Sequence, residues 1–252
     1  MHLPDEFLSS GTASGFAGVA ALAVGLAVQK VRSAFLKKVP VLKARLATFP
    51  DTGSGQRMDS ENRLSKLGRE KIWRMSAVGA LVFSVQMVNF PIGDGTSGHL
   101  LGGVLAALIL GPLEAFLVMV VVLSTQALVF SDGGILALGA NIFNMGIVGA
   151  IGGYSYFRFL VKDSGNTKKN FWSGAFVAAW FSVVFAAIAA SFEIAWSGTK
   201  PIATVLPAMT LTHMLIGLSE GVITVMMLVL LHRKKFPLEI LRKEKEKVYA
   251  NE

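Results

Sequence analysis

The sequence predicts an all-α polytopic membrane helical bundle with about seven transmembrane segments, folded as a single integral membrane domain over residues 1–252. Composition is the first indication, because 53% of the residues are hydrophobic and only 16% are charged, whereas soluble domains carry roughly 25% charged residues. The second is a series of apolar runs of helical length. The third is the confinement of lysine and arginine to alternate connections between those runs.

The apolar runs are long enough for spanning helices, with one exception. A spanning helix needs roughly 20 apolar residues, and the run at 99–111 is shorter and ends at Gly111-Pro112, which separates it from the next run. We expect a partial helix there, sheltered inside the bundle. The runs lie at about residues 12–29, 75–92, 99–111, 113–131, 139–160, 171–195 and 204–231.

The basic residues orient this bundle. Of the 24 lysines and arginines, twelve lie in 30–74, four in 158–169 and seven in 233–247. Only Lys200 falls on the opposite side of the seven-segment arrangement. Because cytoplasmic loops carry the excess of basic residues, we place the amino terminus outside and the carboxyl terminus in the cytoplasm. The expected location is the cell inner (cytoplasmic) membrane.

Two basic stretches are interpreted as connections rather than as sites. Residues 30–74 are long and polar and are expected to form a mobile, solvated cytoplasmic loop, with contact to anionic headgroups as the alternative, and residues 233–252 a cytoplasmic tail. The net charge of +8 does not indicate nucleic acid, because the basic residues do not cluster on a soluble domain. The absence of cysteine excludes disulfides and thiolate metal sites, and the first ten residues lack the positive region of an export signal.

With this orientation, three of the four histidines fall in the outer half of the bundle. His2 is outside, His99 lies in the outer loop "FPIGDGTSGHLLGG", and His213 lies in the outer part of the last segment. His232 alone is cytoplasmic. Histidine is the commonest metal ligand among side chains, so the shared side of these three residues indicates a candidate site.

The first two residues form a candidate chelate. The free amine of Met1, the backbone nitrogen of His2 and the Nδ1 of its imidazole can close adjacent chelate rings of low strain on one metal ion. Binding would deprotonate the amide, which suits Ni(II) or Cu(II), and a fourth nitrogen would complete a square-planar set. His99 is the best fourth donor by topology, because its flanking glycines let the backbone approach closely.

Each histidine also has an ordinary structural role open to it. His2 fits an exposed chain end, and His99 fits a hydrogen bond at the start of a helix. His213 fits a buried neutral histidine that donates to a carbonyl. Their common side favours the metal site over three independent structural roles.

Four polar residues in or near the predicted spans are candidates for functional or structural contacts. Asn141 and Asn144 lie just inside a span, after the outward-facing stretch "FSDGGILALGANIFNMG", and can hydrogen-bond between helices. Glu193 and Glu220 lie in or near spans, where a carboxyl group is costly and is usually functional or paired.

Four stretches, in order along the chain, resemble blocks of the NikM/CbiM family. These are the substrate-binding S components of energy-coupling-factor transporters, a class of ABC transporter, for nickel and cobalt. The resemblance extends from Met1 to about Leu231 and implies a seven-helix fold whose amino terminus inserts into the bundle from outside. The stretches are "MHLPDEFLS", "QMVNFPIGDGTSGHLLGG", "ILGPLEAFLVMVVVLSTQALVFSDGGILALGANIFNMGIVG" and "THMLIGLSEG".

The resemblance also implies residue roles. In the family the metal is held by nitrogens of the first residue, of the histidine at the second position and of a histidine in the loop after the second helix. These positions are Met1, His2 and His99 here. Three further residues fall in family motifs close to the site, and we assign them contacts around the ligands or with residues 1–11, the outer metal-binding plug. These residues are Asn141, Asn144 and His213.

The chain departs from the family pattern at two places. Glu6 stands where glycine is common, which would stiffen the plug, and the 30–74 connection is longer than is common. Neither departure touches a proposed ligand. The stretch "GTSGHLLGG" resembles nickel-type more than cobalt-type members, so nickel is the preferred ion and cobalt the alternative.

The predicted function is that of an uptake subunit, not an enzyme. The chain has no G-x-x-x-x-G-K stretch and therefore no P-loop. The family implies a coupling transmembrane subunit and two ATP-binding cassette subunits as partners, with Ni²⁺ or Co²⁺ as substrate and no catalytic cofactor. A gradient-driven carrier is the alternative, for which Glu193 and Glu220 supply few charges. A hydrolase is disfavoured because H-E-x-x-H is absent.

Overall fold

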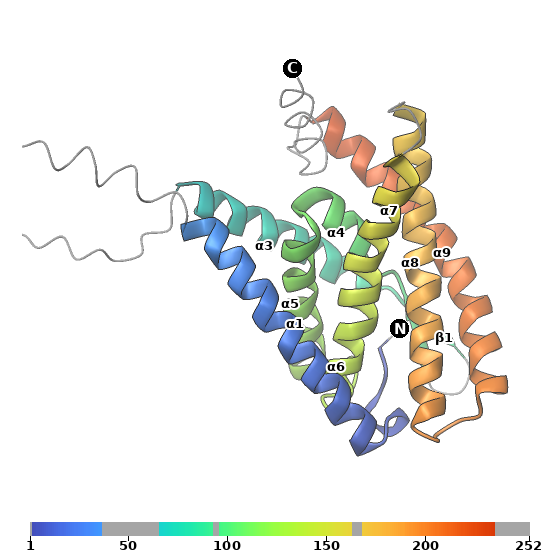
Figure 1. The fold of residues 1–252 in the computed structure, drawn as a ribbon. Helices are drawn as coiled ribbons and strands as arrows, with labels where there is room; N and C mark the ends of the chain where they lie inside the picture. The colour runs from blue at the N-terminus through green and yellow to red at the C-terminus, as the bar shows by residue number, and fades with distance from the viewer. Residues whose placement is uncertain (1, 37–65, 93–95, 163–167, 235–252) are drawn as a thin grey trace, which may run out of the picture.

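The computed structural model describes residues 2–36, 66–92, 96–162 and 168–234 (Figure 1). Helices form nearly all of the regular structure in these ranges. In chain order the elements are the 3-10 helix η1 (Asp5–Phe7), α1 (Ser10–Leu36), α3 (Lys66–Gln86), β1 (Asn89–Ile92), β2 (Thr96–His99), α4 (Gly103–Leu110), α5 (Pro112–Val129), α6 (Leu138–Asn141), the π-helix η2 (Ile142–Gly152), α7 (Gly153–Lys162), α8 (Lys168–Trp196) and α9 (Ile202–Arg233).

The helices are those of a multi-pass membrane protein. Four stretches within the described ranges are long and apolar enough to cross a membrane: Ser10–Arg32, Pro112–Val129, Asn170–Trp196 and Ile202–Arg233. The count of seven spans stays a prediction.

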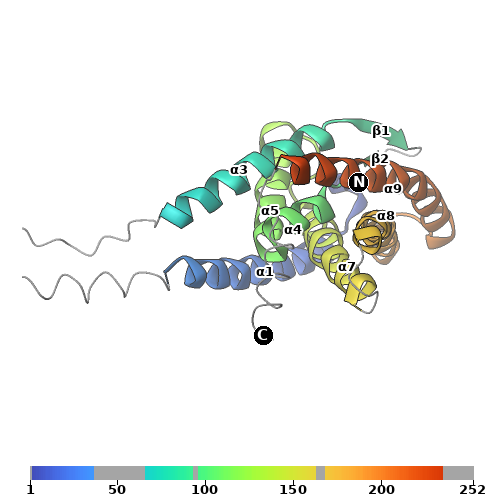
Figure 2. The same ribbon diagram turned by 90° about the horizontal axis from the view of Figure 1, so that it is seen from above.

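The short helix α4 lies in the middle of the bundle, as the sequence predicts for the run at 99–111. All eight of its residues are buried, and α3, α5, η2, α7, α8 and α9 pack against it (Figure 2). A helix of eight residues rises only about 12 Å, so α4 is a partial helix whose surroundings are protein rather than lipid.

The connections between the helices lie at the two ends of the bundle. The ends of α1, α7 and α9 and the starts of α3 and α8 lie in the upper half of Figure 1. Helix η1 and the connections from α5 to α6 and from α8 to α9 lie at the lower end (Figure 1). The described chain therefore passes back and forth between the two ends, and which end faces the cytoplasm stays a prediction.

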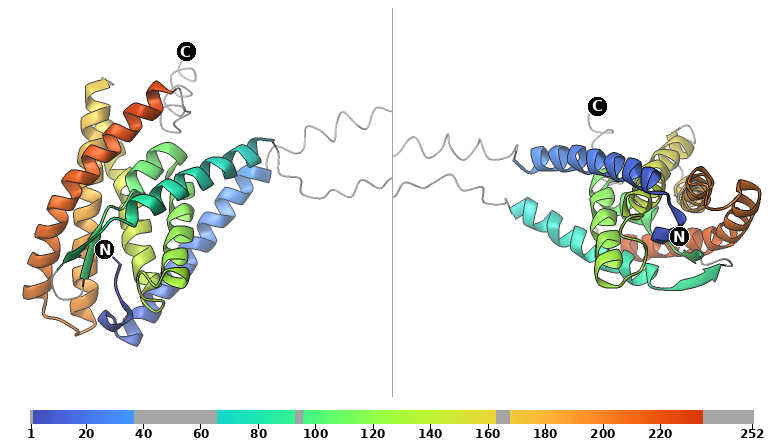
Figure 3. Two further views of the ribbon diagram at one scale, coloured as in Figure 1. Left: turned by 180° about the vertical axis from the view of Figure 1, so that it is seen from behind. Right: turned by 90° about the horizontal axis from the view of Figure 1, so that it is seen from below.

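A short β-hairpin interrupts the otherwise helical structure. The apolar run at 75–92 was expected to be helical to its end, but α3 stops at Gln86 and β1 begins at Asn89. Pro91 lies in β1, and proline disfavours the helical conformation of the residue before it and removes a helix hydrogen bond. Antiparallel pairing then sets Asn89 opposite His99. Figure 3 shows the hairpin beside α9, with which β2 is in contact.

The ends of the 30–74 connection are helical. Helix α1 continues to Leu36 and α3 begins at Lys66, which is physically reasonable because lysine and arginine are good helix formers. The rest of the expected loop, 37–65, and most of the expected tail, 235–252, lie outside the described residues.

Candidate metal centre

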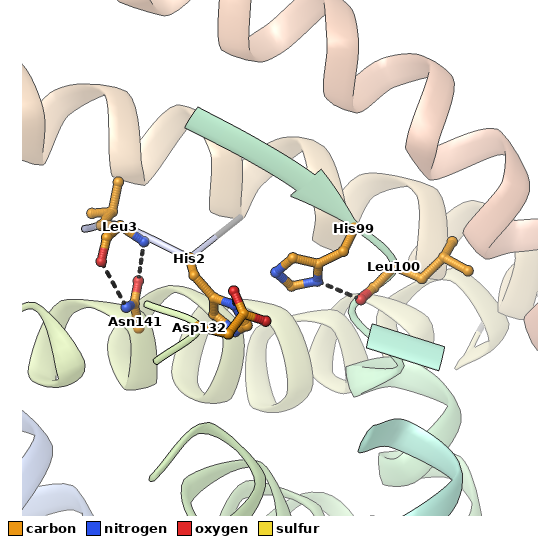
Figure 4. Close-up of polar contacts among 6 residues, drawn as sticks. All are labelled: His2, Leu3, His99, Leu100, Asp132 and Asn141. Carbon is orange, nitrogen blue, oxygen red and sulfur yellow. Dashed lines mark hydrogen bonds and ion pairs between the residues drawn. The ribbon is translucent and has the colours of Figure 1, made fainter. Parts of the chain in front are cut away.

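The chain segment just after Met1 lies inside the bundle rather than on its surface. His2 is 4% exposed and Leu3 is 1% exposed. The backbone N–H of Leu3 donates to Oδ1 of Asn141 at 2.8 Å, and Nδ2 of Asn141 donates to the Leu3 carbonyl at 3.2 Å (Figure 4). The N–H of Gly134 donates to the same carbonyl at 2.9 Å. Both backbone groups of Leu3 are therefore bound. Met1 itself lies outside the described residues.

The next residues hold the segment at the lower end of Figure 1. Oδ1 of Asp5 accepts from the backbone N–H groups of Leu136 and Ala137, at 2.7 and 3.1 Å, just before α6 begins, where free N–H groups favour a negative charge. The hydroxyl of Thr199 donates to the Phe7 carbonyl at 2.9 Å. Glu6, one of the departures from the family pattern, is exposed and lies between these anchors.

Two glycines allow the segment to come this close. Gly133 has a φ of +92°, and a Cβ at this position would lie 3.1 Å from the Cβ of His2. A Cβ on Gly134 would meet the Asp5 carboxylate and would lie 2.5 Å from the Asp5 backbone nitrogen. The pair Gly133-Gly134 thus leaves room for the amino-terminal segment that larger residues would fill.

His2 and His99 face each other in the interior. Their ring centroids are 4.4 Å apart, and His99 is completely buried at the end of β2 (Figure 4). Nδ1 of His99 lies 2.8 Å from the Leu100 carbonyl oxygen. A carbonyl can only accept, so Nδ1 carries the proton and Nε2 carries the lone pair. Within the described ranges, that Nε2 has no hydrogen-bond partner.

Burial keeps the His99 ring neutral. It lowers the pKa of His99 well below its ordinary value, and the neighbouring ring of His2 lowers it further. A neutral imidazole with a free nitrogen is the form that binds a metal ion.

Asp132 is a member of the site that sequence reasoning missed. Its Oδ1 lies 3.0 Å from Nδ1 of His2, without the alignment of a hydrogen bond. The His2 ring holds the pKa of the Asp132 carboxyl below its ordinary value, while burial lowers the pKa of His2. The stretch "FSDGG" contains this aspartate. The available signal was an acidic residue beside two glycines, in a connection predicted to lie on the same side of the bundle as His2 and His99.

The other predicted residues make contacts of their own, outside the His2–His99 pair. His213 directs Nδ1 to the Met209 carbonyl at 2.7 Å, which is the ordinary role that the sequence left open, and its buried Nε2 has no partner among the described residues. Asn144 donates from Nδ2 to Oε2 of Glu193 at 2.8 Å, so its observed contact runs to α8 rather than to a histidine. His232 is exposed near the end of α9.

Side chains alone do not complete a metal site here. In the part of the chain that the structure describes, no group of three or more His, Asp or Glu residues stands in position to hold a metal ion. An ion held by His2 and His99 would need further donors. The predicted chelate takes them from the backbone nitrogen of His2 and from the amine of Met1.

Comparison with known proteins places the chain in a family. A family model described as "Cobalt uptake substrate-specific transmembrane region" matches residues 60–238. The chain belongs to this cobalt-uptake family. The resemblance to NikM/CbiM proteins is thereby confirmed, and the matched region contains His99, Asp132, Asn141, Asn144 and all of α4 to α9.

Relatives and solved structures of the cobalt-uptake family agree with this assignment. A fused nickel transport protein, NikMN, of Archaeoglobus fulgidus is 44% identical over 149 residues, which are 58% of this chain and 48% of that relative. The chain therefore spans about half the length of the fused protein. A metal transport protein of Haloquadratum walsbyi is 34% identical over 228 residues, 89% of this chain and 86% of its own. A solved transition metal transporter has a TM-score of 0.74 at 26% identity and covers 98% of this chain and 99% of its own.

Proposed function

We propose that the chain is the substrate-specific subunit of an ATP-driven energy-coupling-factor importer and binds Ni²⁺, or alternatively Co²⁺, from outside the cell. The ligands are the Met1 amine, the backbone nitrogen and Nδ1 of His2, and Nε2 of His99. The supporting observation is the pairing of His2 with His99, two buried rings 4.4 Å apart, with Nε2 of His99 left without a hydrogen-bond partner in the described chain.

The chemistry of this pair favours a metal ion over a structural role. A buried polar atom left without a partner costs about 1–3 kcal/mol, and a metal bound to Nε2 of His99 would remove that cost. Four nitrogen donors in a plane suit Ni(II). Deprotonating the His2 amide leaves a site of net charge +1 around a divalent ion, and the Asp132 carboxylate, 3.0 Å from Nδ1 of His2, offsets that charge. Loading requires Nδ1 to turn from Asp132 to the metal.

The topology supports uptake from outside. Within the seven-segment arrangement, 23 of the 24 basic residues lie on one side, and the positive-inside rule makes that side cytoplasmic. Residues 2–8 lie in the lower part of the bundle in Figure 1, away from the end where α9 finishes. The site is then reached from the outer face of the cell inner membrane.

Energy for import comes from partner subunits. The chain has no P-loop, and its family is described as the substrate-specific region of an uptake system. We therefore assign ATP hydrolysis to two ATP-binding cassette subunits and the coupling of that hydrolysis to a further transmembrane subunit. In this scheme the loaded subunit reorients in the lipid bilayer and releases the ion inward.

Metal titration of the purified chain tests the proposal. We expect His99→Ala to weaken Ni(II) binding by at least about 100-fold, because one of four nitrogens is lost, which corresponds to about 2.7 kcal/mol. His232→Ala is the matched control, since this exposed histidine near the end of α9 should leave affinity unchanged. Isothermal titration with Ni(II) and Co(II) measures both variants and ranks the two ions. Equal affinity of His99→Ala and wild type would refute the site.

The gradient-driven carrier gains no support from the buried carboxylates. Glu193 accepts from the Asn144 amide and Glu220 accepts from two backbone N–H groups. These contacts hold the fold together rather than form a chain of titrating groups. Metal accumulation in liposomes that contain only this chain and an ion gradient would nevertheless decide for the carrier.

A further inference from the structure

The buried carboxylate of Glu220 has partners that bear directly on His99. Glu220 lies on α9 and is 2% exposed. Its Oε2 accepts from the backbone N–H of Leu101 at 2.9 Å, and its Oε1 accepts from that of Gly102 at 2.7 Å. Both amides belong to the short connection between β2, which ends at His99, and α4.

The first of these amides also carries the carbonyl that His99 uses. The N–H of Leu101 and the carbonyl of Leu100 belong to one peptide group, and that carbonyl accepts from Nδ1 of His99 at 2.8 Å. A trans peptide directs its N–H and its carbonyl to opposite sides, and the described chain has no cis peptide bond. Two hydrogen bonds therefore link the Glu220 carboxylate to the His99 imidazole through the Leu100–Leu101 peptide group.

The second peptide group is fixed in the same way. Its N–H, from Gly102, is bound by Glu220 at 2.7 Å, and its carbonyl, from Leu101, accepts from Nε2 of Gln86 at 2.7 Å. Gly102 has a φ of +70°, and a Cβ there would lie 3.1 Å from the Val82 side chain. The Leu100–Leu101 and Leu101–Gly102 peptide groups are thus held between α9 and the end of α3.

We propose that Glu220 is a positioning residue for the metal-binding imidazole of His99, acting through the Leu100–Leu101 peptide group to hold the proton on Nδ1 and present the Nε2 lone pair to the metal. A negative charge on the N–H polarises the peptide and makes its carbonyl a stronger acceptor. In many metal sites a carboxylate contacts the ligating histidine directly and has this effect; here a peptide group lies between them. The inference rests on the proposed function, because His99 is a ligand only there.

The ring proton gives a test that needs no metal. In the metal-free wild type labelled with ¹⁵N-histidine, we expect the His99 ring to carry its proton on Nδ1, with the signal assigned by its loss in His99→Ala. Glu220→Gln keeps the size of the side chain but directs an NH₂ group at a backbone N–H, so the His99 ring should show a mixture of both tautomers. Glu114→Gln makes the same chemical change at a carboxylate paired with Lys71 at 3.0 Å, away from the site, and should leave the His99 signals as they are.

Nickel affinity gives the second readout. We expect Glu220→Gln to weaken Ni(II) binding by about 10- to 100-fold, the range typical of groups that orient a metal-binding histidine, with Glu220→Asp weakened as well because its shorter side chain cannot reach both amides. Glu114→Gln should bind as wild type does.

The outcomes separate this inference from the proposed function. A wild type that binds neither Ni(II) nor Co(II) defeats the proposed function. If the wild type binds nickel and Glu220→Gln has the same His99 tautomer and the same Ni(II) affinity, the inference is overturned. It is overturned as well if the only effect of Glu220→Gln is a lower thermal stability. Should neither Glu220 variant fold, the wild-type spectrum still decides, because a proton on Nε2 of metal-free His99 overturns the inference.

Discussion

Adding a single residue in front of Met1 is expected to abolish nickel binding. His2 is 4% exposed, and both backbone groups of Leu3 are bound by Asn141 and Gly134, so the position of the chain at residues 2–3 is fixed. An added residue moves the free amine one position away from the His2 chelate and replaces it with an amide. We expect a loss of at least about 100-fold in affinity, or about 2.7 kcal/mol.

Isothermal titration of the extended protein measures this loss. The control carries the same added residue after Glu252, at the predicted cytoplasmic end, and should bind nickel as the unmodified chain does. Unaltered affinity in the amino-terminally extended protein would rule out the Met1 amine as a ligand. The side-chain pairing of His2 with His99 would then need a different set of completing donors.

Gly134→Ala should displace the amino-terminal segment without disturbing the bundle. The new Cβ would meet the Asp5 carboxylate and would lie 2.5 Å from the Asp5 backbone nitrogen, so Asp5 must move. Its contacts with Leu136 and Ala137, at 2.7 and 3.1 Å, are then lost. Because His2 lies only three residues before Asp5, we expect nickel affinity to fall by about 10- to 100-fold, about 1.4–2.7 kcal/mol.

Gly18→Ala is the matched control for this substitution. Gly18 lies in α1, and a Cβ there has nothing within 4 Å. Alanine is also favoured over glycine in a helix, by about 1 kcal/mol. Nickel titration of both variants, together with hydrogen exchange at the Leu3 amide, distinguishes displacement of the segment from general unfolding. A Gly134→Ala protein with normal affinity and a protected Leu3 amide would contradict this account of the docked segment.

Much of the helical framework could be predicted from the sequence, because a buried or membrane-spanning helix is a continuous run of apolar residues and such runs are visible in the sequence itself. The short buried helix α4 followed from a run too brief to span a membrane and from the Gly111-Pro112 break. The hairpin did not follow, since the residues up to Ile92 are as apolar as the helix before them and only Pro91 signals the change.

The site was predictable only where topology could place residues on a common side. His2 and His99 were paired by that argument, and they lie with ring centroids 4.4 Å apart. The partners of Glu220 could not be foreseen, because they are backbone amides of Leu101 and Gly102, 119 and 118 positions away. Backbone groups carry no sequence signal. Asp132 was missed because an aspartate beside two glycines resembles an ordinary turn.

In the proposed function, the amino-terminal segment would also set the timing of uptake. His99 has no exposed surface and His2 has 4%, and the amino-terminal segment runs from the interior to η1 at the lower end of the bundle (Figure 3, left). In the proposed function, a metal ion would reach both rings after this segment swings outward, and the Met1 amine would move with it. Loading would then be a step in which the chain carries its own ligand back into the protein. Its rate at high metal concentration would be set by the opening of the segment rather than by collision with the ion, and the bound ion would leave outward no faster than the segment reopens.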